Sequence, residues 1–280
     1  MVAVQAVKLA CERPDACGRS LSHWDCAEIA RQLVAEAVVP SISTETVRRL
    51  LERQHLKPWR YHLWLSPKVP RDAHFLAQVQ EVIDLYTRPL AEHEVVLSVD
   101  EKTNLQPRPR TSATRAATPK QPMRVEQEYQ RVGAVNLLAA FNTRTGQVTG
   151  VTASRKRQAE FIELLELLEA QTPSTVTTIH VVMDNVRMHT GKQVQAWLAE
   201  HPRFVCHFTP VHCSWLNQIE QWFSILQRKR LRVVDFASLA QLGTRLHQFI
   251  EQWNARAHPF QWTTQSAAKV RAKCGLSSAA

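Results

Sequence analysis

The sequence predicts a mixed α/β domain, in which helices cover a sheet, preceded by a small all-α region. Two observations lead to this prediction. Short runs rich in β-branched and apolar residues begin only near residue 94, and from residue 158 onward they alternate with helical patterns. Residues 1–68 show short helical patterns alone. With 280 residues, 44% of them hydrophobic, the chain can form one large domain and a small one.

The N-terminal region contains two short amphipathic helices. Asp25 or Ser22 can cap the first, and Ser43 can cap the second, over 44–53, after a proline-containing break. Two short helices joined by a tight turn resemble a helix-turn-helix, whose second helix enters the major groove of DNA. A plain helical hairpin with a solvated basic face is the alternative. The basic residues of the second helix, which we expect to face outward, are Arg48, Arg49 and Arg53.

One apolar stripe over 71–87 predicts a helix that leads into the main domain. Strands are then expected at 95–100, 133–141, 148–153, 178–183 and 204–208. Helices are expected at 158–170, 191–200, 215–230 and 239–254. The predicted organisation is a helix-turn-helix region over 1–70, a linker helix over 71–93, a catalytic domain over 94–265 and a C-terminal tail over 266–280.

A long basic loop separates the first two strands. Residues 105–124 contain four prolines and no acidic residue, and a loop of this length inside a compact domain is usually functional or disordered. A basic loop stiffened by proline is suited to lie along a phosphate backbone. A floppy solvated insertion is the alternative. Its basic residues are Arg108, Arg110, Arg115, Lys120 and Arg124.

Composition narrows the classes of partner. The formal net charge of +10 favours a polyanion, with nucleic acid ahead of a membrane surface. No apolar run is long enough for a membrane span, and unpaired cysteine spacing favours a reducing compartment, so we expect a cytoplasmic protein. Neither GxGxxG nor GxxxxGK[ST] occurs, so no nucleotide cofactor is expected.

Acidic residues stand where two predicted strands end. Asp100 follows Val95–Val99 and Asp184 follows Ile179–Met183. An acid directly after a buried strand projects from the carboxyl edge of the sheet, where α/β folds bind ligands. A single acid in this position is more often a helix cap or a turn residue. Two of them on related strands favour a site.

A third acid, Glu220, borders the apolar stripe of the helix predicted over 215–230. It can therefore face the sheet edge, and Asn217, one turn earlier, shares its side of the helix. Helical spacing favours core packing over base stacking for Trp215, Trp222 and Phe223. Glu101 and Lys102 are expected to point away from Asp100.

Three converging carboxylates repel one another strongly unless divalent cations lie between them. Oxygen ligands suit Mg²⁺ or Mn²⁺, and two such ions about 4 Å apart can activate a nucleophile and stabilise a leaving oxygen at a phosphodiester. The acids alone would suit any nuclease that uses two metal ions.

Three stretches of the chain resemble the DDE transposases of bacterial insertion sequences, in the IS-six-thirty branch of the mariner superfamily. They are Ser98–Thr103, Val182–His189 and His207–Phe223, and thirty-five residues separate Asp184 from Glu220, as in that family. Shorter stretches fit as well, at residues 41–47, 204–208, 253–254 and 259–263. The resemblance covers roughly residues 20–265.

The resemblance implies an RNase H-like catalytic domain whose metal-binding acids are Asp100, Asp184 and Glu220. It also implies an enzyme that cuts double-stranded DNA at transposon terminal repeats and joins the 3′-hydroxyl ends to target DNA, with two Mg²⁺ or Mn²⁺ ions and no covalent protein intermediate. Asn185 and His189 match supporting positions. A homodimer in a bacterial cytoplasm, associated with the nucleoid when bound to DNA, is expected from the same likeness.

The chain departs from the family in one respect. Family members usually carry a further helix-turn-helix upstream, and this chain has room for only one before residue 70, so we expect an N-terminally short version. A remnant that only binds DNA is therefore one alternative. A structure-specific nuclease on the same fold, which cuts without joining, is the other.

Overall fold

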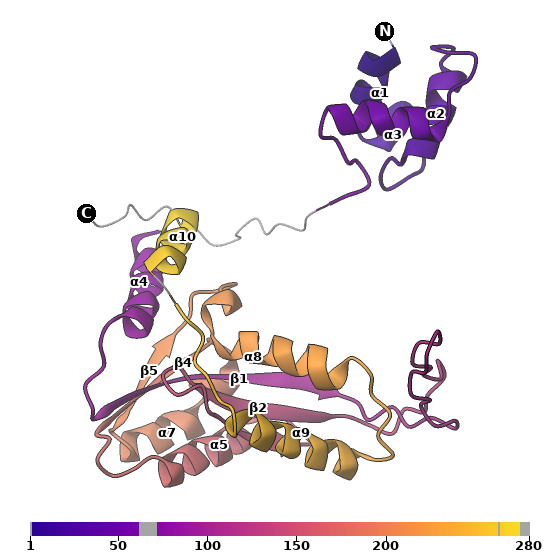
Figure 1. Cartoon of the computed structure of the whole chain (residues 1–280). Helices are drawn as coiled ribbons and strands as arrows, with labels where there is room; N and C mark the ends of the chain where they lie inside the picture. Colours follow the sequence, from indigo (N-terminus) through magenta and orange to yellow (C-terminus); the bar gives the residue numbers. More distant parts are fainter. Residues whose placement is uncertain (1, 62–71, 263, 275–280) are drawn as a thin grey trace. The chain divides into compact units, whose positions relative to one another are not determined.

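The computed structural model describes residues 2–61, 72–262 and 264–274. The chain divides into two compact units, Met1–Ser66 and Pro67–Ala280, which Figure 1 shows with their helices and strands. The domain boundary expected at residue 70 and the start of the linker helix expected at residue 71 lie outside the described residues. In the described part of the chain, no helix is both long and apolar enough to span a membrane.

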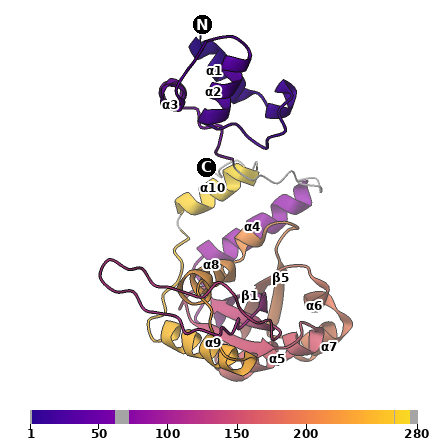
Figure 2. The same cartoon turned by 90° about the vertical axis from the view of Figure 1, so that its right-hand side faces the viewer.

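The smaller unit packs three helices around a compact core. They are α1 (Val2–Cys11), α2 (Cys26–Ala35) and α3 (Thr44–Arg53), with a 3-10 turn at Pro14–Cys17 (Figure 2). Asp25 caps α2 by accepting the backbone N–H of Glu28, and Ser43 caps α3 in the same way, as the sequence predicted. The core side chains of this unit are Ala6, Leu9, Trp24, Ile29, Ala30, Leu33, Val47 and Leu51.

The larger unit is built on a five-stranded mixed sheet. Its strands are β1 (Glu94–Leu105), β2 (Val135–Asn142), β3 (Val148–Ala153), β4 (Thr178–Met183) and β5 (Phe204–Phe208), in the order β3-β2-β1-β4-β5. The first three strands are antiparallel, whereas β4 and β5 run parallel to β1. This arrangement confirms the predicted mixed α/β domain.

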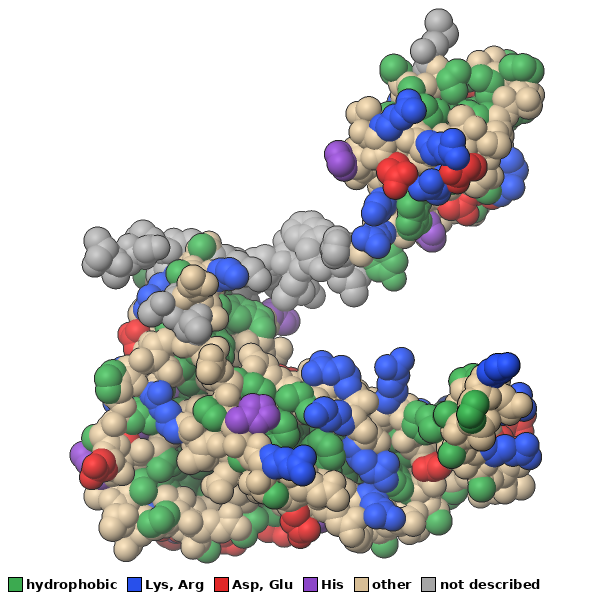
Figure 3. Space-filling view, in the orientation of Figure 1, with side chains coloured by type: hydrophobic (Ala, Val, Ile, Leu, Met, Phe, Trp, Pro, Cys, Tyr) green, Lys and Arg blue, Asp and Glu red, His purple; other side chains and the backbone are tan. Residues whose placement is uncertain are grey.

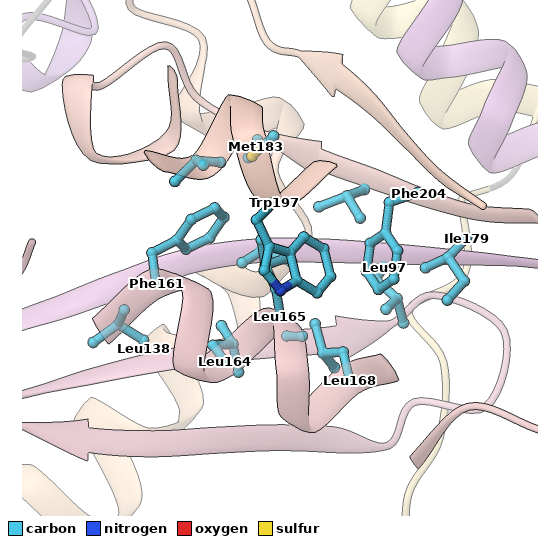
Figure 4. Packing of buried hydrophobic residues seen from close by; sticks show 14 of the residues in the cluster. Leu97, Leu138, Phe161, Leu164, Leu165, Leu168, Ile179, Met183, Trp197 and Phe204 are labelled. Atoms are coloured by element: carbon cyan, nitrogen blue, oxygen red, sulfur yellow. The ribbon is translucent and has the colours of Figure 1, made fainter. Parts of the chain in front are cut away.

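Helices cover both faces of the sheet. On one face, α5 (Gln158–Gln171) and α7 (Lys192–Glu200) pack on alternate residues of β1 and β2, and Figure 4 shows this core around Phe161, Leu165 and Trp197. On the other face lie α8 (Ile219–Leu226) and α9 (Leu239–Asn254), packed on Leu137, Ala139 and Phe141 of β2. Side chains of α4 (Ala73–Thr87) and α10 (Thr264–Cys274) pack together beside β1 and β4.

Two predicted boundaries were wrong, and both concern residues near one end of the sheet. The first strand does not end at Asp100, because β1 continues to pair with β2 as far as Leu105, with Asp100 opposite Ala139. The helix expected from Trp215 begins only at Ile219, after a 3-10 turn at Ser214–Leu216. It then passes into a π-helical turn at Gln227–Leu231.

The C-terminal region contains a further helix. A tail is expected over 266–280, and in the described part of that region α10 occupies Thr264–Cys274. Ala267 and Cys274 are buried in the same cluster as Val79 and Ile83 of α4. Helix α4 therefore packs within the larger unit together with a segment far from it in sequence.

Candidate active site

Asp100 lies on β1 immediately beyond the part of that strand that pairs with β4. The last pair between these strands is Ser98 with Val182 and β4 ends at Met183, so Asp100 stands just beyond the end of β4, level with Asp184. Its Oδ1 accepts the backbone N–H of Glu101 at 2.8 Å, and its Oδ2 lies 3.4 Å from Nδ2 of Asn217. Asp100 is thereby held at the carboxyl edge of the parallel part of the sheet.

Asp184 directly follows Met183, the last residue of β4. Its Oδ1 lies 2.9 Å from Nδ1 of His189, a residue of the short helix α6 (Arg187–Thr190) whose side chain is fully buried. The His189 ring packs on Phe161, with 4.4 Å between the ring centroids. The neighbouring Asn185 donates its side-chain N–H to the carbonyl of Thr209 at 2.8 Å, which ties the loop after β4 to the segment after β5.

Glu220 occupies the first turn of α8, and the residues before it fix that turn to β1. Asn217 donates from Nδ2 to the carbonyl of Val99 at 2.9 Å, and the backbone N–H of Gln218 donates to Oγ of Ser98 at 3.3 Å. Asn217 thus precedes the helix instead of lying within it. These two bonds explain why the helical pattern is interrupted and why Glu220 is brought to the strand that carries Asp100.

The three carboxylates influence one another electrostatically. Burial, together with the negative charges of Glu101, Asp184 and Glu220, raises the pKa of Asp100 to about 7. Burial also raises the pKa of Glu220. The hydrogen bond from His189 lowers the pKa of Asp184, so that this acid is held in its charged form.

The pKa of His189 is shifted upward, in the opposite direction to that of its partner Asp184. Burial lowers the pKa of the His189 imidazole, but its bonds to the side chain and backbone of Asp184 outweigh burial, and the net effect is a raised pKa. Within the described residues, no group of three or more His, Cys, Asp or Glu side chains is placed so that it could hold a metal ion. The acids therefore share one negative environment without enclosing an ion by themselves.

The residues around the acids were only partly predicted. Trp222 and Phe223 are core residues, as expected, but Trp215 is 43% exposed and the expectation of core packing was wrong for it. Glu101 points away from Asp100, and its side chain is 8% exposed. Lys102 lies on the same face of β1 as Asp100, because residues two apart on a strand share a face. Its charge lowers the pKa of Glu220, so the expectation that it points away from the site was wrong.

The predicted DNA-binding arginines of the smaller unit lie on its surface. Arg48 forms ion pairs with Glu45 at 2.8 Å and Glu52 at 2.9 Å, and Arg49 pairs with Glu45 at 2.9 Å. Arg53 is exposed as well. The basic face of α3 is therefore partly neutralised by acids of the same helix.

The long loop between β1 and β2 is more ordered than the sequence suggested. Antiparallel bridges join Arg115 to Arg124 and Thr118 to Gln121, with Lys120 at the tip, so the segment folds as a narrow hairpin that Figure 2 shows projecting from the sheet. At its base the guanidinium of Arg108 lies over the ring of Tyr129, 5.1 Å from the centroid. Its neighbour Arg110 donates to the carbonyls of Glu126 and Val234.

The hairpin is therefore anchored to the segment that follows α8. Arg110 is used by these internal bonds, whereas Arg115, Lys120 and Arg124 are exposed. On the face of the larger unit in Figure 3, Lys and Arg side chains gather over α8 and the segment after it, with few acids among them. Arg228, Lys229 and Arg232 are exposed in that segment. This basic face is suited to an anionic polymer.

Comparisons with known proteins agree with this geometry. A family model described as DDE superfamily endonuclease matches residues 95–243. The chain is 27% identical over 259 residues to the insertion element IS630 uncharacterized 39 kDa protein of Shigella sonnei. The match covers 90% of this chain and 70% of that protein.

Solved structures show the same fold. The Mos1 mariner paired-end complex with Mn has a TM-score of 0.55 at 14% identity, and the Mos1 strand transfer complex has a TM-score of 0.57 at 14% identity. Each match covers 98% of this chain and 76% of the other chain. The likeness confirms an RNase H-like fold for the sheet and its helices.

Proposed function

Because the chain belongs to the DDE superfamily endonucleases, we propose that it is a DNA transposase that cuts at transposon terminal repeats and joins the 3′-hydroxyl ends to target DNA. The observation that supports this proposal most directly is the placement of three acids. Asp100 on β1, Asp184 after β4 and Glu220 at the start of α8 come from distant parts of the sequence and share one electrostatic environment. They are the catalytic acids of the proposal.

The donor set fits divalent cations with a preference for oxygen ligands. Burial and the neighbouring negative charges raise the pKa of Asp100 to about 7, so a cation bound among the three acids would relieve an electrostatic cost. All three side chains are carboxylates, and oxygen ligands of this kind suit Mg²⁺ or Mn²⁺. The solved Mos1 complex named above contains Mn, and another Mos1 paired-end complex contains Mg.

We assign Asp100, Asp184 and Glu220 as the residues that hold two such ions. When bound, the ions would polarise a phosphodiester, supply a nucleophile and stabilise the leaving oxygen. The chain's own contribution is positioning. Asn217 holds the start of α8 against β1, and His189 orients Asp184. Asn185 ties the loop after β4 to Thr209, which follows β5.

Double-stranded DNA is the proposed partner, both as transposon ends and as target. The basic hairpin between β1 and β2 and the basic face over α8 would contact the phosphate backbone, and α3 would recognise sequence in the major groove. We assign end recognition to residues 1–70, a linking role to 71–93 and catalysis to 94–265. Two of the Mos1 neighbours are paired-end complexes, and by analogy we propose a homodimer of this chain that bridges two DNA ends. The proposed location is the bacterial cytoplasm.

An end-cleavage assay tests the proposal. Purified protein receives labelled DNA that carries the terminal repeats of the element that encodes it, with Mg²⁺ present or withheld, and Asp184→Ala and Glu220→Ala serve as controls. We expect cleavage at the repeat ends that requires Mg²⁺ and disappears in both variants, while binding of the DNA persists.

The two alternatives give different results when branched DNA and a target plasmid are added to the assay as further substrates. Binding without cleavage in the presence of Mg²⁺ would indicate a remnant that only binds DNA. Cleavage of branched DNA in preference to repeat ends, without joining, would indicate a structure-specific nuclease. Either result would refute the proposed function.

A further inference from the structure

The residue after Asp100 carries a buried carboxylate that the proposed chemistry does not use. Glu101 points to the opposite face of the sheet, and its side chain is 8% exposed. In the described part of the chain, its Oε2 is buried without a hydrogen-bond partner. A buried carboxylate oxygen without a partner is costly, so its retention beside the site needs a reason.

The atom that Glu101 faces is also buried and unpaired. Nε2 of His189 has no hydrogen-bond partner among the described residues, and it lies 3.8 Å from Oε2 of Glu101. The other oxygen of Glu101 lies 3.5 Å from Nζ of Lys156. Two unsatisfied polar atoms thus face each other at slightly more than hydrogen-bond distance, in a place closed to water.

The other ring nitrogen of His189, Nδ1, contacts Asp184. Nδ1 of His189 lies 2.9 Å from Oδ1 of Asp184 and 3.2 Å from its backbone oxygen. Packing against Phe161 leaves the ring little freedom to turn. Glu101, His189 and Asp184 therefore form a continuous row that runs from β1 to the end of β4.

We propose that Glu101 is a positioning residue, which fixes the His189 ring and through it the orientation of the Asp184 carboxylate toward the metal ions. This inference rests on the proposed function, since it assumes that Asp184 binds a divalent ion. The side chain of Asp184 is 38% exposed, and apart from His189 it is held by a 3.3 Å bond from the backbone N–H of Val186. The bonds from His189 and from the backbone N–H of Val186 both use Oδ1, which leaves Oδ2 for an ion.

A direct role for Glu101 as a metal ligand fits the geometry less well. Adjacent residues on a strand point to opposite faces, so Glu101 and Asp100 project on opposite sides of β1. The nearest polar groups to Glu101 are the edge of an imidazole and a lysine ammonium. His189 is the group that hydrogen-bonds to the proposed ligand Asp184, and the loss of such a group typically costs about 10- to 100-fold in metal affinity. Glu101 acts one step further out, through the position of that ring.

Binding of Mn²⁺ to the full chain, measured from the free-ion signal in electron paramagnetic resonance without DNA, tests the inference apart from activity. Glu101→Gln keeps the length of the side chain and can donate to Nε2 of His189, so we expect its Mn²⁺ affinity to stay near that of the parent. Glu101→Asp keeps the charge but is too short to reach the ring, and we expect about tenfold weaker binding. If the aspartate variant does not fold, Glu101→Ser replaces it, and its comparison with Glu101→Gln separates reach from charge because both side chains are neutral and only glutamine is long enough to reach the ring.

A matched control removes a glutamate of the same domain outside the row. Glu169 on α5 pairs with Arg203 at 2.7 Å, and Glu169→Gln should leave Mn²⁺ binding unchanged. The double variant Glu101→Asp/Asp184→Asn should bind Mn²⁺ no more weakly than Asp184→Asn alone, because both changes act through the same carboxylate.

The outcomes separate the two claims. If Glu101→Asp binds Mn²⁺ as tightly as the parent while Asp184→Asn does not, the positioning role is refuted and the metal site stands. If Glu101→Gln loses as much affinity as Glu101→Asp, the charge itself is required, and the positioning role is again refuted. If the parent chain binds no Mn²⁺ that depends on Asp184, the proposed function fails and the inference fails with it.

Discussion

The clustered acids of the proposed site should destabilise the metal-free protein, and Asp100→Asn should relieve that cost. Burial and the neighbouring carboxylates raise the pKa of Asp100 from 3.8 to about 7 in the folded chain. In the unfolded chain the same carboxyl titrates near pH 4. Between about pH 4 and pH 7 the folded state therefore binds more protons than the unfolded state, and its stability falls as the pH rises through this window.

The size of the effect follows from the shift. A difference of about three pKa units, at about 1.4 kcal/mol each, corresponds to roughly 4 kcal/mol of stability lost above pH 7. Asparagine carries no charge, and its side-chain oxygen can still accept the N–H of Glu101 that Asp100 accepts at 2.8 Å. Asp100→Asn should therefore be more stable than the parent at pH 8, by up to about 4 kcal/mol, and close to it at pH 4.

Urea unfolding in the presence of EDTA at pH 4, 6 and 8 measures this difference. The control is Asp84→Asn, which removes an exposed carboxylate of α4 outside the acid cluster. Mg²⁺ at a hundred times its dissociation constant should raise the unfolding free energy of the parent by about 2.7 kcal/mol. The increase for Asp100→Asn should be far smaller. Equal stabilities of the parent and Asp100→Asn at pH 8 would refute the reasoning, because the carboxylate would then carry no buried charge.

Three further changes test the packing and the ion pairs. Gly146 has φ of +77° and a Cβ there would lie 2.2 Å from the backbone of His258, so Gly146→Ala should cost at least about 2 kcal/mol in urea unfolding, and an unchanged midpoint would contradict the turn. The hydrogen bond and charge of Arg88 lower the pKa of Glu94 to about 2. The parent should therefore lose thermal stability as the pH falls from about 4 toward 2, and Glu94→Gln should lose less. An equal dependence of melting temperature on pH in both proteins would exclude the ion pair of Arg88 and Glu94. Trp222 is fully buried, and Trp222→Ala should cost about 3–5 kcal/mol of unfolding free energy; a loss below 1 kcal/mol would show that the core beneath α8 is not packed as described.

Much of the sheet could be predicted because its buried strands are continuous apolar runs. The runs ending at Val99 and Met183 identified the strands and placed an acid after each. The end of β1 could not be predicted, since residues 101–104 are polar in sequence and become part of the strand only because β1 pairs with β2. The local sequence pattern indicates which residues are buried, but it does not indicate that residues beyond Asp100 pair with β2.

The candidate site was predictable in its acids and less so in their supports. Glu220 and Asn217 were identified from the helical pattern, but the start of α8 depends on bonds from Asn217 and Gln218 to β1, which no local pattern contains. The row of Glu101, His189 and Asp184 depends on the register of β1 against β4 and on the short helix α6. Strand alternation alone could place Glu101 on the far face, without naming what it meets there.

Strand transfer of a pre-cut transposon end into a supercoiled plasmid tests the central claim most directly. The DNA already bears the 3′-hydroxyl, so joining reports the chemistry of the acids separately from end cleavage, and gel-shift binding to the same DNA reports recognition. The account predicts Mg²⁺-dependent joining by the parent and a loss of more than about a hundredfold in Glu220→Gln with binding retained, a larger effect than for residues behind the ligands. Joining by Glu220→Gln at the parent rate would contradict it.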